Sequence, residues 1–453
     1  MRDLTQGSVT KQILAMALPI TVGMVVQTLY LMVDLYFVAS LGSTALAGVN
    51  AASNVMMLVM ALTQMLSVGT VALIARAVGA RQTGNANLVF NQALLIALLL
   101  TALTLGFGYW VADTYMTSLA ADDPTRQAGI VYLHWYLPGL ALMFVSSVMG
   151  AALRGTGIVK PTMVVQMLTV LVNIILTPIM TAGWLTGYPL GVMGAAFSST
   201  LAVLVGVVLL AWYFLRLEHL VKLDIALLKP NFAVWKQLFN IGLPSGGEFL
   251  MLFASTALSY WVIKDFGSQA QAAYGVGSRL MQFFFMPAMA VSFALPAIVG
   301  QNLGAGQGGR IREALNKALL IEVVLMTLAM LLCQWQPQAL AEVFTQDPAV
   351  LAFAEQFLAI ISFIFVASGI NFTCSSFFQG MGNTWPALFT AASRLALFAA
   401  GAFYLAHQGD FALTELWHWS VWVGFMQAAL SYVLARREMA RKLPALVPLD
   451  AQG

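Results

Sequence analysis

Charged residues are scarce in this chain. Only 9% of its 453 residues are Asp, Glu, Lys or Arg, whereas soluble domains carry about 25% charged residues. Apolar residues make up 60% of the chain, and the mean hydropathy is +0.85. This composition excludes an ordinary soluble domain, and we expect no nucleic-acid partner.

Histidine and cysteine are also few, which argues against an enzyme or a metal cluster. The four histidines show no H-E-x-x-H or comparable ligand spacing, and Cys333 and Cys374 lie in or near apolar segments. The glycine-rich segment 303–309 lacks the Lys-Ser/Thr ending of a phosphate loop, so we interpret it as a tight turn. We predict no disulfide and no enzymatic activity, and an intramembrane enzyme is the weakest of the alternative hypotheses.

Long apolar runs dominate what the chain does contain. Polar breaks divide them into twelve segments, each of about 20 residues or more, which is enough to cross a hydrocarbon core of about 30 Å. The sequence therefore predicts an all-α polytopic membrane protein with twelve transmembrane helices. The predicted spans are 13–40, 45–74, 86–112, 128–151, 161–183, 190–216, 236–263, 269–299, 314–335, 350–377, 386–406 and 412–435.

Basic residues are distributed unevenly between these spans. The odd-numbered connections contain only Arg126 and Lys264, whereas the remaining basic residues outside the spans lie in or beside the even-numbered connections or at the two ends. In multi-pass proteins the cytoplasmic loops carry the excess of Lys and Arg. We therefore predict a bacterial inner-membrane protein with both termini in the cytoplasm.

The second half of the chain repeats the first at an offset of 225 residues. This offset superposes Pro19 on Pro244 and R-G-T-G-I-V-K-P (154–161) on Q-G-M-G-N-T-W-P (379–386). Each half contains six predicted spans with the same topology, as in transporters built from parallel repeats. We predict an N-lobe at 1–216, a cytoplasmic linker at 217–235, a C-lobe at 236–440 and a cytoplasmic tail at 441–453.

The repeated motifs resemble those of a known family. They are an L-P pair early in spans 1 and 7, G-S-x-A-L-A-G from Gly42, the glycine-containing turns after spans 2 and 8, and R-G-x-G-x3-P after span 4. Over essentially the whole chain they are similar to MATE (multidrug and toxic compound extrusion) transporters. The resemblance implies two pseudo-symmetric six-helix bundles in a V arrangement. It also implies efflux of amphipathic, often cationic compounds in exchange for H+ or Na+.

Within that family the chain looks more like the DinF-type branch. The branch has an Asp late in span 1, here Asp34, and an N-x3-D pair in span 5. Asn173 is present here, but Thr177 replaces the second acid, and its hydroxyl group cannot carry a coupling proton. The acidic residues of the NorM branch find no match, because Leu252 and Ser368 stand at roughly those places.

Asp34 has no visible counter-charge, since no Lys or Arg lies between Lys11 and Arg76. A charged Asp in mid-membrane costs a few kcal/mol, so such a group must pair, line water or take up a proton. At about 1.5 Å per residue, Asp34 lies about 30 Å along its helix from Ile13, in the outer half of the bilayer. A carboxyl group whose protonation depends on its hydration suits a proton-coupled transporter. We therefore assign ion coupling to Asp34.

Polar residues on neighbouring spans extend this candidate site. Their alternative role is to join helices, at under about 1 kcal/mol each. We expect H+ as the coupling ion, with Na+ near Asp34 and Asn173 as the alternative, and no other cofactor. The predicted ion-coupling residues are Asp34, Tyr30, Asn173, Thr177 and Ser199, and the predicted substrate-cavity residues are Gln27, Asn50, Asn54, Gln166, Glu248 and Arg279.

The C-lobe carries more intramembrane charge than the N-lobe. Glu248, Arg279, Glu322 and Arg394 all lie within or near its spans. These charges can balance in pairs, such as Glu322 with Arg394, and such a structural ion pair is as well supported as a substrate role. The repeat counterpart of Asp34 is Ser259, which confines the coupling carboxylate to the N-lobe.

A lipid-linked precursor flippase of the same superfamily is the main alternative function. Such a protein is expected to line its cavity with several Arg or Lys residues that hold pyrophosphate. Away from their ends, the predicted spans offer only Arg279 and Arg394, both in one lobe. We therefore favour drug-like small molecules as substrates, the lipid bilayer as the other partner, and a monomer.

Overall fold

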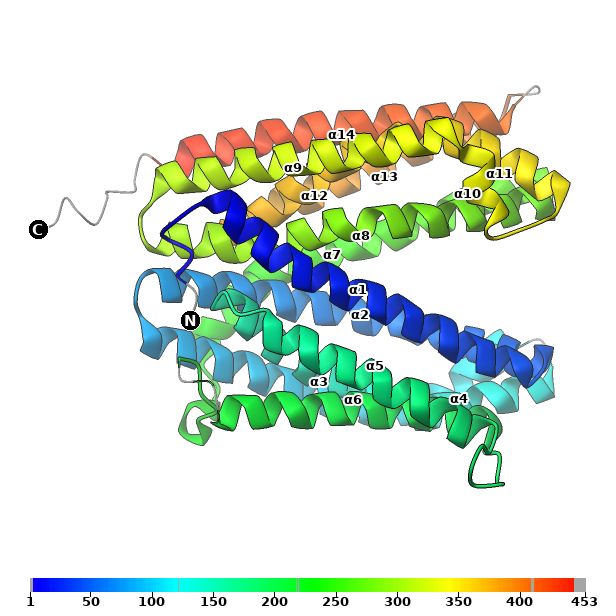
Figure 1. The fold of residues 1–453 in the computed structure, drawn as a ribbon, viewed down its shortest axis with the longest axis horizontal. Coiled ribbons are helices and arrows are strands. Elements are labelled where there is room, and N and C mark those ends of the chain that lie inside the picture. Colours follow the sequence, from blue (N-terminus) through cyan, green and yellow to red (C-terminus); the bar gives the residue numbers. More distant parts are fainter. Residues whose placement is uncertain (1–2, 121, 217, 219, 409–410, 444–453) are drawn as a thin grey trace, which may run out of the picture. The chain divides into compact units, whose positions relative to one another are not determined.

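A computed structural model describes residues 3–120, 122–216, 218, 220–408 and 411–443. Within these residues the secondary structure consists of α-helices and two short 3-10 helices, η1 (Ile225–Leu228) and η2 (Lys264–Phe266), without a strand (Figure 1). The helices form two compact units.

Unit 1 contains Val22–Gly242. Its central helix is α4 (Asp123–Gly155), which packs against α2, α3 and α6. The side chain of Asp122 caps α4 by accepting a hydrogen bond from the backbone N–H of Thr125 at 2.8 Å. The other α-helices of unit 1 are the second part of α1 (Val9–Ser40), α2 (Ser43–Gly79), α3 (Thr83–Leu119), α5 (Lys160–Thr181), α6 (Gly191–Arg216) and the first part of α7 (Phe232–Ile263).

Unit 2 contains Asp3–Thr21 and the chain from Leu243 onward. Its core includes the rings of Tyr274 and Trp417, which stack with centroids 5.7 Å apart. Its α-helices are the remaining parts of α1 and α7, with α8 (Ser268–Gly304), α9 (Gly308–Trp335), α10 (Pro337–Glu342), α11 (Pro348–Ile361), α12 (Ile364–Gly380), α13 (Trp385–Ala406) and α14 (Leu413–Lys442).

Helices occupy all twelve predicted spans, which confirms the all-α fold class. Ten helices in the described part of the chain are long and apolar enough to cross a membrane, and the bent pair of α11 and α12 adds an eleventh if it is one span. The pair is bent by 56°. Helix α14 is long enough at 30 residues, but Trp, His and Gln side chains lower its mean hydropathy below that of the other spans.

The two compact units do not divide the chain where the predicted lobes do. Both α1 and α7 pass from one unit to the other, after Thr21 and after Gly242. A proline lies inside each helix close to that point, Pro19 in α1 and Pro244 in α7. Proline removes a backbone hydrogen bond inside a helix and favours a bend there. The predicted lobe boundaries stay a prediction about topology, and residues 444–453 of the predicted tail lie outside the described residues.

The segment predicted as a linker is packed on α3 of unit 1. Asn91 Nδ2 donates to the carbonyl oxygen of Lys222 at 2.9 Å, and Asn91 Oδ1 accepts from the backbone N–H of Asp224 at 2.9 Å. Gln92 Nε2 donates to the carbonyl oxygens of Leu227 at 2.6 Å and Lys229 at 2.7 Å. Two buried amides of a predicted span therefore hold the connection in a defined conformation.

The N-terminal segment is held within unit 2 in a similar way. Leu4 and Val9 are fully buried. Asn302 Nδ2 donates to the carbonyl oxygen of Leu4 at 3.1 Å, and Arg310 Nη1 donates to the carbonyl oxygen of Gly7 at 2.9 Å. Arg310 Nε also donates to Asn302 Oδ1 at 3.0 Å, which keeps both side chains in place.

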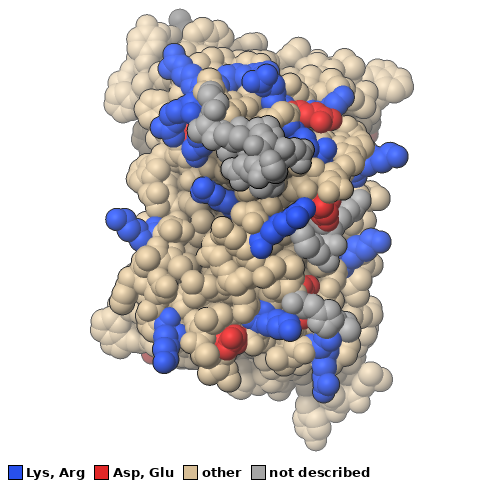
Figure 2. Space-filling view, turned by 90° about the vertical axis from the view of Figure 1, so that its left-hand side faces the viewer, with Lys and Arg blue, Asp and Glu red and all other residues tan. Residues whose placement is uncertain are grey.

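Basic residues lie at helix ends in both units. Helices α2, α4, α6 and α14 carry Arg or Lys in their last turn, where positive charge interacts favourably with the helix dipole. Figure 2 shows one end face of the molecule, on which Lys and Arg clearly outnumber Asp and Glu. The excess of basic side chains on this one face agrees with the uneven distribution of charge in the sequence. The orientation of the termini across the membrane stays a prediction.

Candidate ion-coupling site

Asp34 lies on α1, six residues before the helix ends at Ser40. Its Oδ1 atom is buried and has no hydrogen-bond partner. No ion pair involves Asp34 among the residues that the structure describes. Leaving a buried carboxylate oxygen unpaired is costly, so this group has the properties of a site that takes up a proton or a cation.

A hydrogen-bond network of neutral side chains joins α1, α5 and α6. Tyr30, one helical turn before Asp34, donates through its hydroxyl group to Ser199 Oγ at 3.1 Å. Asn173 Nδ2 donates to the same oxygen at 3.2 Å. Thr177 Oγ1 donates to Asn173 Oδ1 at 3.2 Å. The structure thus brings together the four residues that were predicted beside Asp34.

Ser199 is the centre of this network. Its oxygen accepts from both Tyr30 and Asn173, which uses its two lone pairs and leaves its own hydrogen for a third partner. Ser198, which was not among the predicted site residues, lies 3.0 Å from Thr177 Oγ1. Thr177 therefore positions Asn173 through neutral hydrogen bonds, where an acid would have added a second charge.

Two tyrosines of α4 also lie near Asp34, and the sequence-based prediction missed them. Tyr132 and Tyr136 are close enough for a charge on Asp34 to act on their hydroxyl groups. Their ring centroids are 5.2 Å apart, and both rings are buried. Their spacing of four residues places them on one face of α4, a signal that was available in the sequence.

The predicted cavity residues of unit 1 divide into two groups. Gln166 Nε2 donates to Gln27 Oε1 at 2.9 Å, so these two amides join α5 to α1. Asn50 and Asn54 are exposed on α2. In the part of the chain that the structure describes, neither asparagine has a hydrogen bond to the network around Ser199.

In unit 2 the predicted residues lie apart from one another. Glu248 on α7 accepts a hydrogen bond from Ser375 at 2.7 Å, and Arg279 is exposed on α8. The predicted ion pair of Glu322 with Arg394 is wrong: the ion pairs between described residues do not include it. The reason is the packing, because α9 packs against α8 and α12, whereas α13 packs mainly against α14.

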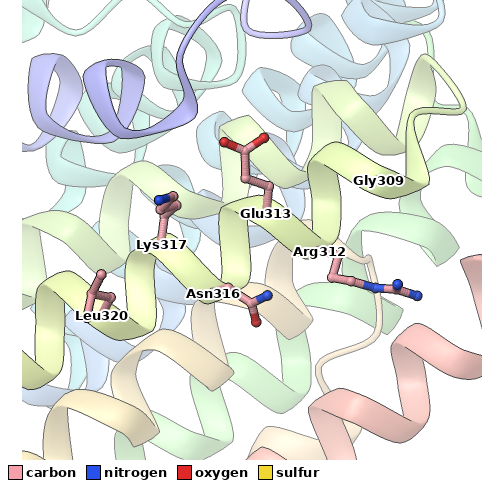
Figure 3. Close-up of a pocket in the computed structure, with 6 residues that line it drawn as sticks. All are labelled: Gly309, Arg312, Glu313, Asn316, Lys317 and Leu320. Carbon is pink, nitrogen blue, oxygen red and sulfur yellow. The ribbon is translucent and has the colours of Figure 1, made fainter.

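A surface pocket lies elsewhere in unit 2, along the first turns of α9. It is lined by Gly309, Arg312, Glu313, Asn316, Lys317 and Leu320. Figure 3 shows Glu313 and Lys317 pointing to one side of the helix, and Arg312 and Asn316 to the other. The pocket contains none of the predicted site residues, and one helix supplies its whole lining. We therefore place the candidate site at Asp34 and not here.

Comparisons with known proteins identify the repeat and the family. The family model MatE matches residues 19–179 and again residues 244–404, which are the same segment at an offset of 225. The "FAD transporter" of Shewanella oneidensis is 26% identical over 372 residues, 81% of each chain. The "Probable multidrug resistance protein NorM" of Thermotoga maritima is 26% identical over 384 residues, 83% of this chain and 81% of that protein.

Solved structures show the same fold. The "Crystal structure of MATE in complex with MaL6" has a TM-score of 0.92 and 24% identity, and covers 98% of this chain and 99% of that chain. A MOP superfamily transporter from Pyrococcus furiosus has a TM-score of 0.90 and 24% identity, and the match covers 97% of both chains. Since the two family matches together span more than half of its length, this chain belongs to the MATE family of membrane transporters.

Proposed function

We propose that this transporter is an efflux antiporter that exports amphipathic, often cationic compounds in exchange for H+, with Asp34 as the coupling carboxylate. The observation that carries the proposal is the unpaired, buried Oδ1 atom of Asp34 beside a network of neutral donors. Since the neighbouring groups satisfy one another, the carboxyl group alone is left to change its protonation state.

The proposed exchange uses this isolation of the carboxyl group. When water reaches Asp34, the carboxylate is stabilised and releases its proton. When the site closes, desolvation disfavours the charged form, and a proton or a cationic substrate must neutralise it. The two cannot bind together without a net buried positive charge, which makes them alternatives at one site. This competition is what an antiporter requires.

The proposed alternating access uses the helices that continue from one unit into the other. Pro19 and Pro244 lie inside α1 and α7, within a few residues of the points at which these helices change unit. A helix with a missing backbone hydrogen bond bends there at lower cost. Asp34 lies on the part of α1 beyond Pro19, so bending at this proline changes the surroundings of Asp34.

The names of the relatives point to two substrate classes. Several relatives are named as multidrug resistance or export proteins, and one is named as an FAD transporter. We favour amphipathic cations because a cation can neutralise Asp34 in place of the proton, whereas the doubly negative pyrophosphate of FAD would be repelled by it. Ethidium and FAD are therefore the two probes for the export assay.

The test is drug accumulation in cells that express the protein. Cells with the wild type are expected to hold less ethidium than empty cells, and cells with Asp34→Asn are expected to hold as much as empty cells. The matched control is Asp113→Asn, because the Asp113 side chain is 70% exposed and removal of its charge is expected to change nothing. Export of ethidium by Asp34→Asn at the wild-type rate would refute the assignment.

The same cells distinguish the coupling ions. Replacement of Na+ by K+ at a fixed pH gradient is expected to leave ethidium export unchanged. Loss of export in K+ would assign the coupling to Na+, bound by Asp34 and the oxygen atoms of the Ser199 network. Export of FAD with no export of ethidium would overturn the proposed substrate class.

A further inference from the structure

A buried carboxyl group in unit 2 takes no part in the Asp34 site. Glu322 lies on α9 and is 0% exposed. Its Oε1 atom accepts a hydrogen bond from Ser292 on α8 at 3.4 Å, and its Oε2 atom is buried without a partner. One long hydrogen bond does not compensate an ionised carboxylate for the loss of water. In this conformation the group needs a proton.

Helix α12 forms the third wall around Glu322. A Cβ atom at Gly369 would lie 2.9 Å from Met326 Cγ and 3.4 Å from Glu322 Oε2, so the glycine lets α12 lie close to both side chains of α9. Thr373 lies one turn further along the same face of α12, fully buried, and its hydroxyl oxygen also has no partner. Helices α9 and α12 pack against each other and run in opposite directions in Figure 1.

The helices packed against α9 bring no counter-charge to Glu322. The ion pairs between residues that the structure describes do not include Glu322. From α14, Arg436 reaches α9 at Asn316, to which it donates at 3.0 Å, and not at Glu322. The charged and titratable side chains on α8, α10, α11 and α12, the helices packed on α9, are Tyr274, Arg279, Glu342, Glu355 and Cys374.

We propose that Glu322, with Ser292 and Thr373, is a second proton-binding site, and that bending of α8 controls its exchange with water. Ser292 lies between Pro287 and Pro296 in α8, and each proline removes a backbone hydrogen bond of the helix. A bend of α8 at this place moves Ser292 away from Glu322 and admits water to the carboxyl group. Release of the proton is then tied to the conformation of unit 2.

The sequence of unit 1 has no counterpart of this proposed proton-binding site. At the offset of 225 residues the counterpart of Glu322 is Ala97, and α2, the counterpart of α8, has no proline. The counterpart of Ser292 is Ser67, whose oxygen accepts a hydrogen bond from Arg154 at 2.6 Å. The duplicated serine thus contacts a basic residue in unit 1 and an acidic residue in unit 2. The proposal concerns unit 2 alone and stands whether or not Asp34 couples transport.

Infrared spectroscopy of the purified full-length protein tests the proposal, because a protonated carboxyl group absorbs apart from ionised carboxylates. At neutral pH the wild type is expected to show a protonated-carboxyl band that Glu322→Gln removes and Asp34→Asn retains. The band is expected to disappear at alkaline pH. Ser292→Ala, which removes the donor but keeps the acid, is expected to shift the band and the pH at which it disappears.

Transfer into D2O tests the coupling to α8. The deuterium shift of the Glu322 band is expected to be several-fold slower in Pro287→Ala, whose helix bends less readily, than in the control Pro178→Ala in α5. A spectrum in which Glu322→Gln removes no band, or a Glu322 band that never titrates while the protein stays folded, would overturn the proton site. Equal deuterium-shift rates in both proline variants would overturn the control by α8.

Discussion

The side chain of Gln92 holds the segment between the repeats, and its replacement should release that segment. Its Nε2 atom donates to the carbonyl oxygens of Leu227 and Lys229, at 2.6 and 2.7 Å. Its Oε1 atom accepts from the backbone N–H of Asn231 at 2.8 Å and from Trp235 Nε1 at 2.7 Å. All four hydrogen-bonding positions of this fully buried amide are therefore used.

The free energy that stabilises the docked segment follows from these four hydrogen bonds. At about 1 kcal/mol each, they stabilise the docked segment by about 4 kcal/mol. Gln92→Met keeps the size of the side chain and removes all four. A free-energy change of about 1.4 kcal/mol changes an equilibrium constant tenfold. The loss of even a third of this stabilisation would therefore raise the fraction of molecules with an undocked segment about tenfold.

Hydrogen–deuterium exchange of peptides that cover 225–231 measures this fraction. Exchange of their amides is expected to be at least about tenfold faster in Gln92→Met than in the wild type, since exchange follows the free energy of local opening. The control is Asn85→Ala, an exposed position on the same helix, which should leave the exchange unchanged. Equal exchange in both variants would refute the idea that Gln92 holds the segment.

Two further substitutions test the packing and the electrostatics. Gly194→Ala places a Cβ atom against the backbone carbonyl oxygen of Met180 on α5, so thermal unfolding in detergent should show a loss of about 2 kcal/mol of stability. Gly84→Ala, whose Cβ atom would have no atom within 4 Å, should unfold like the wild type. Burial raises the pKa of Glu438, but hydrogen bonds from Lys442 and Asn383 outweigh it and hold the pKa below its ordinary value of 4.5. Because the pKa of Glu438 in the folded state lies below its ordinary value, the ionised carboxylate stabilises the folded state above pH 4.5, and this stabilisation is lost as the pH falls and the group is protonated. The difference in stability between the wild type and Glu438→Gln should therefore be present at neutral pH and disappear below pH 4.5. A gap independent of pH, or equal unfolding of the two glycine variants, would contradict these arguments.

Most of the fold was predictable because hydropathy alone decides where a membrane helix lies. Every predicted span coincides with helix in the structure, with differences of up to seven residues at the ends and one break inside the span 350–377. The break between α11 and α12 was not predictable, because residues 348–380 are apolar on both sides of it and contain no internal proline. Helix α10 was missed as well, since at six residues it is too short for a periodic pattern.

The composition of the sequence did not predict that the predicted linker segment and the N-terminal segment pack onto helices. Both segments are polar and look like solvated loops. The signal lay in their partners: Asn91, Gln92, Gln301 and Asn302 are amides at the ends of apolar helices, and all four are fully buried in the structure. An amide in such a place needs a specific acceptor or donor, but the sequence does not say which segment supplies it.

The candidate site was predictable in part of its members, since Tyr132, Tyr136 and Ser198 were missed, and it was not predictable in its hydrogen bonds. Polar stripes on three spans grouped Tyr30, Asn173 and Ser199, and the structure joins these three side chains by hydrogen bonds. Whether those groups bond to Asp34 or to one another depends on shifts of a few ångströms between helices. The pairing of Glu322 with Arg394 failed for the same reason, since charge alone does not establish that two helices are neighbours.

The most direct test of the account is the proton movement that accompanies export. Proteoliposomes with a pH-sensitive dye inside and an ethidium gradient across the membrane report both fluxes at once. The wild type is expected to move protons against the direction of ethidium, and Asp34→Asn is expected to move none. If Asp34→Asn still carried protons in exchange for ethidium, Asp34 would not be the coupling group.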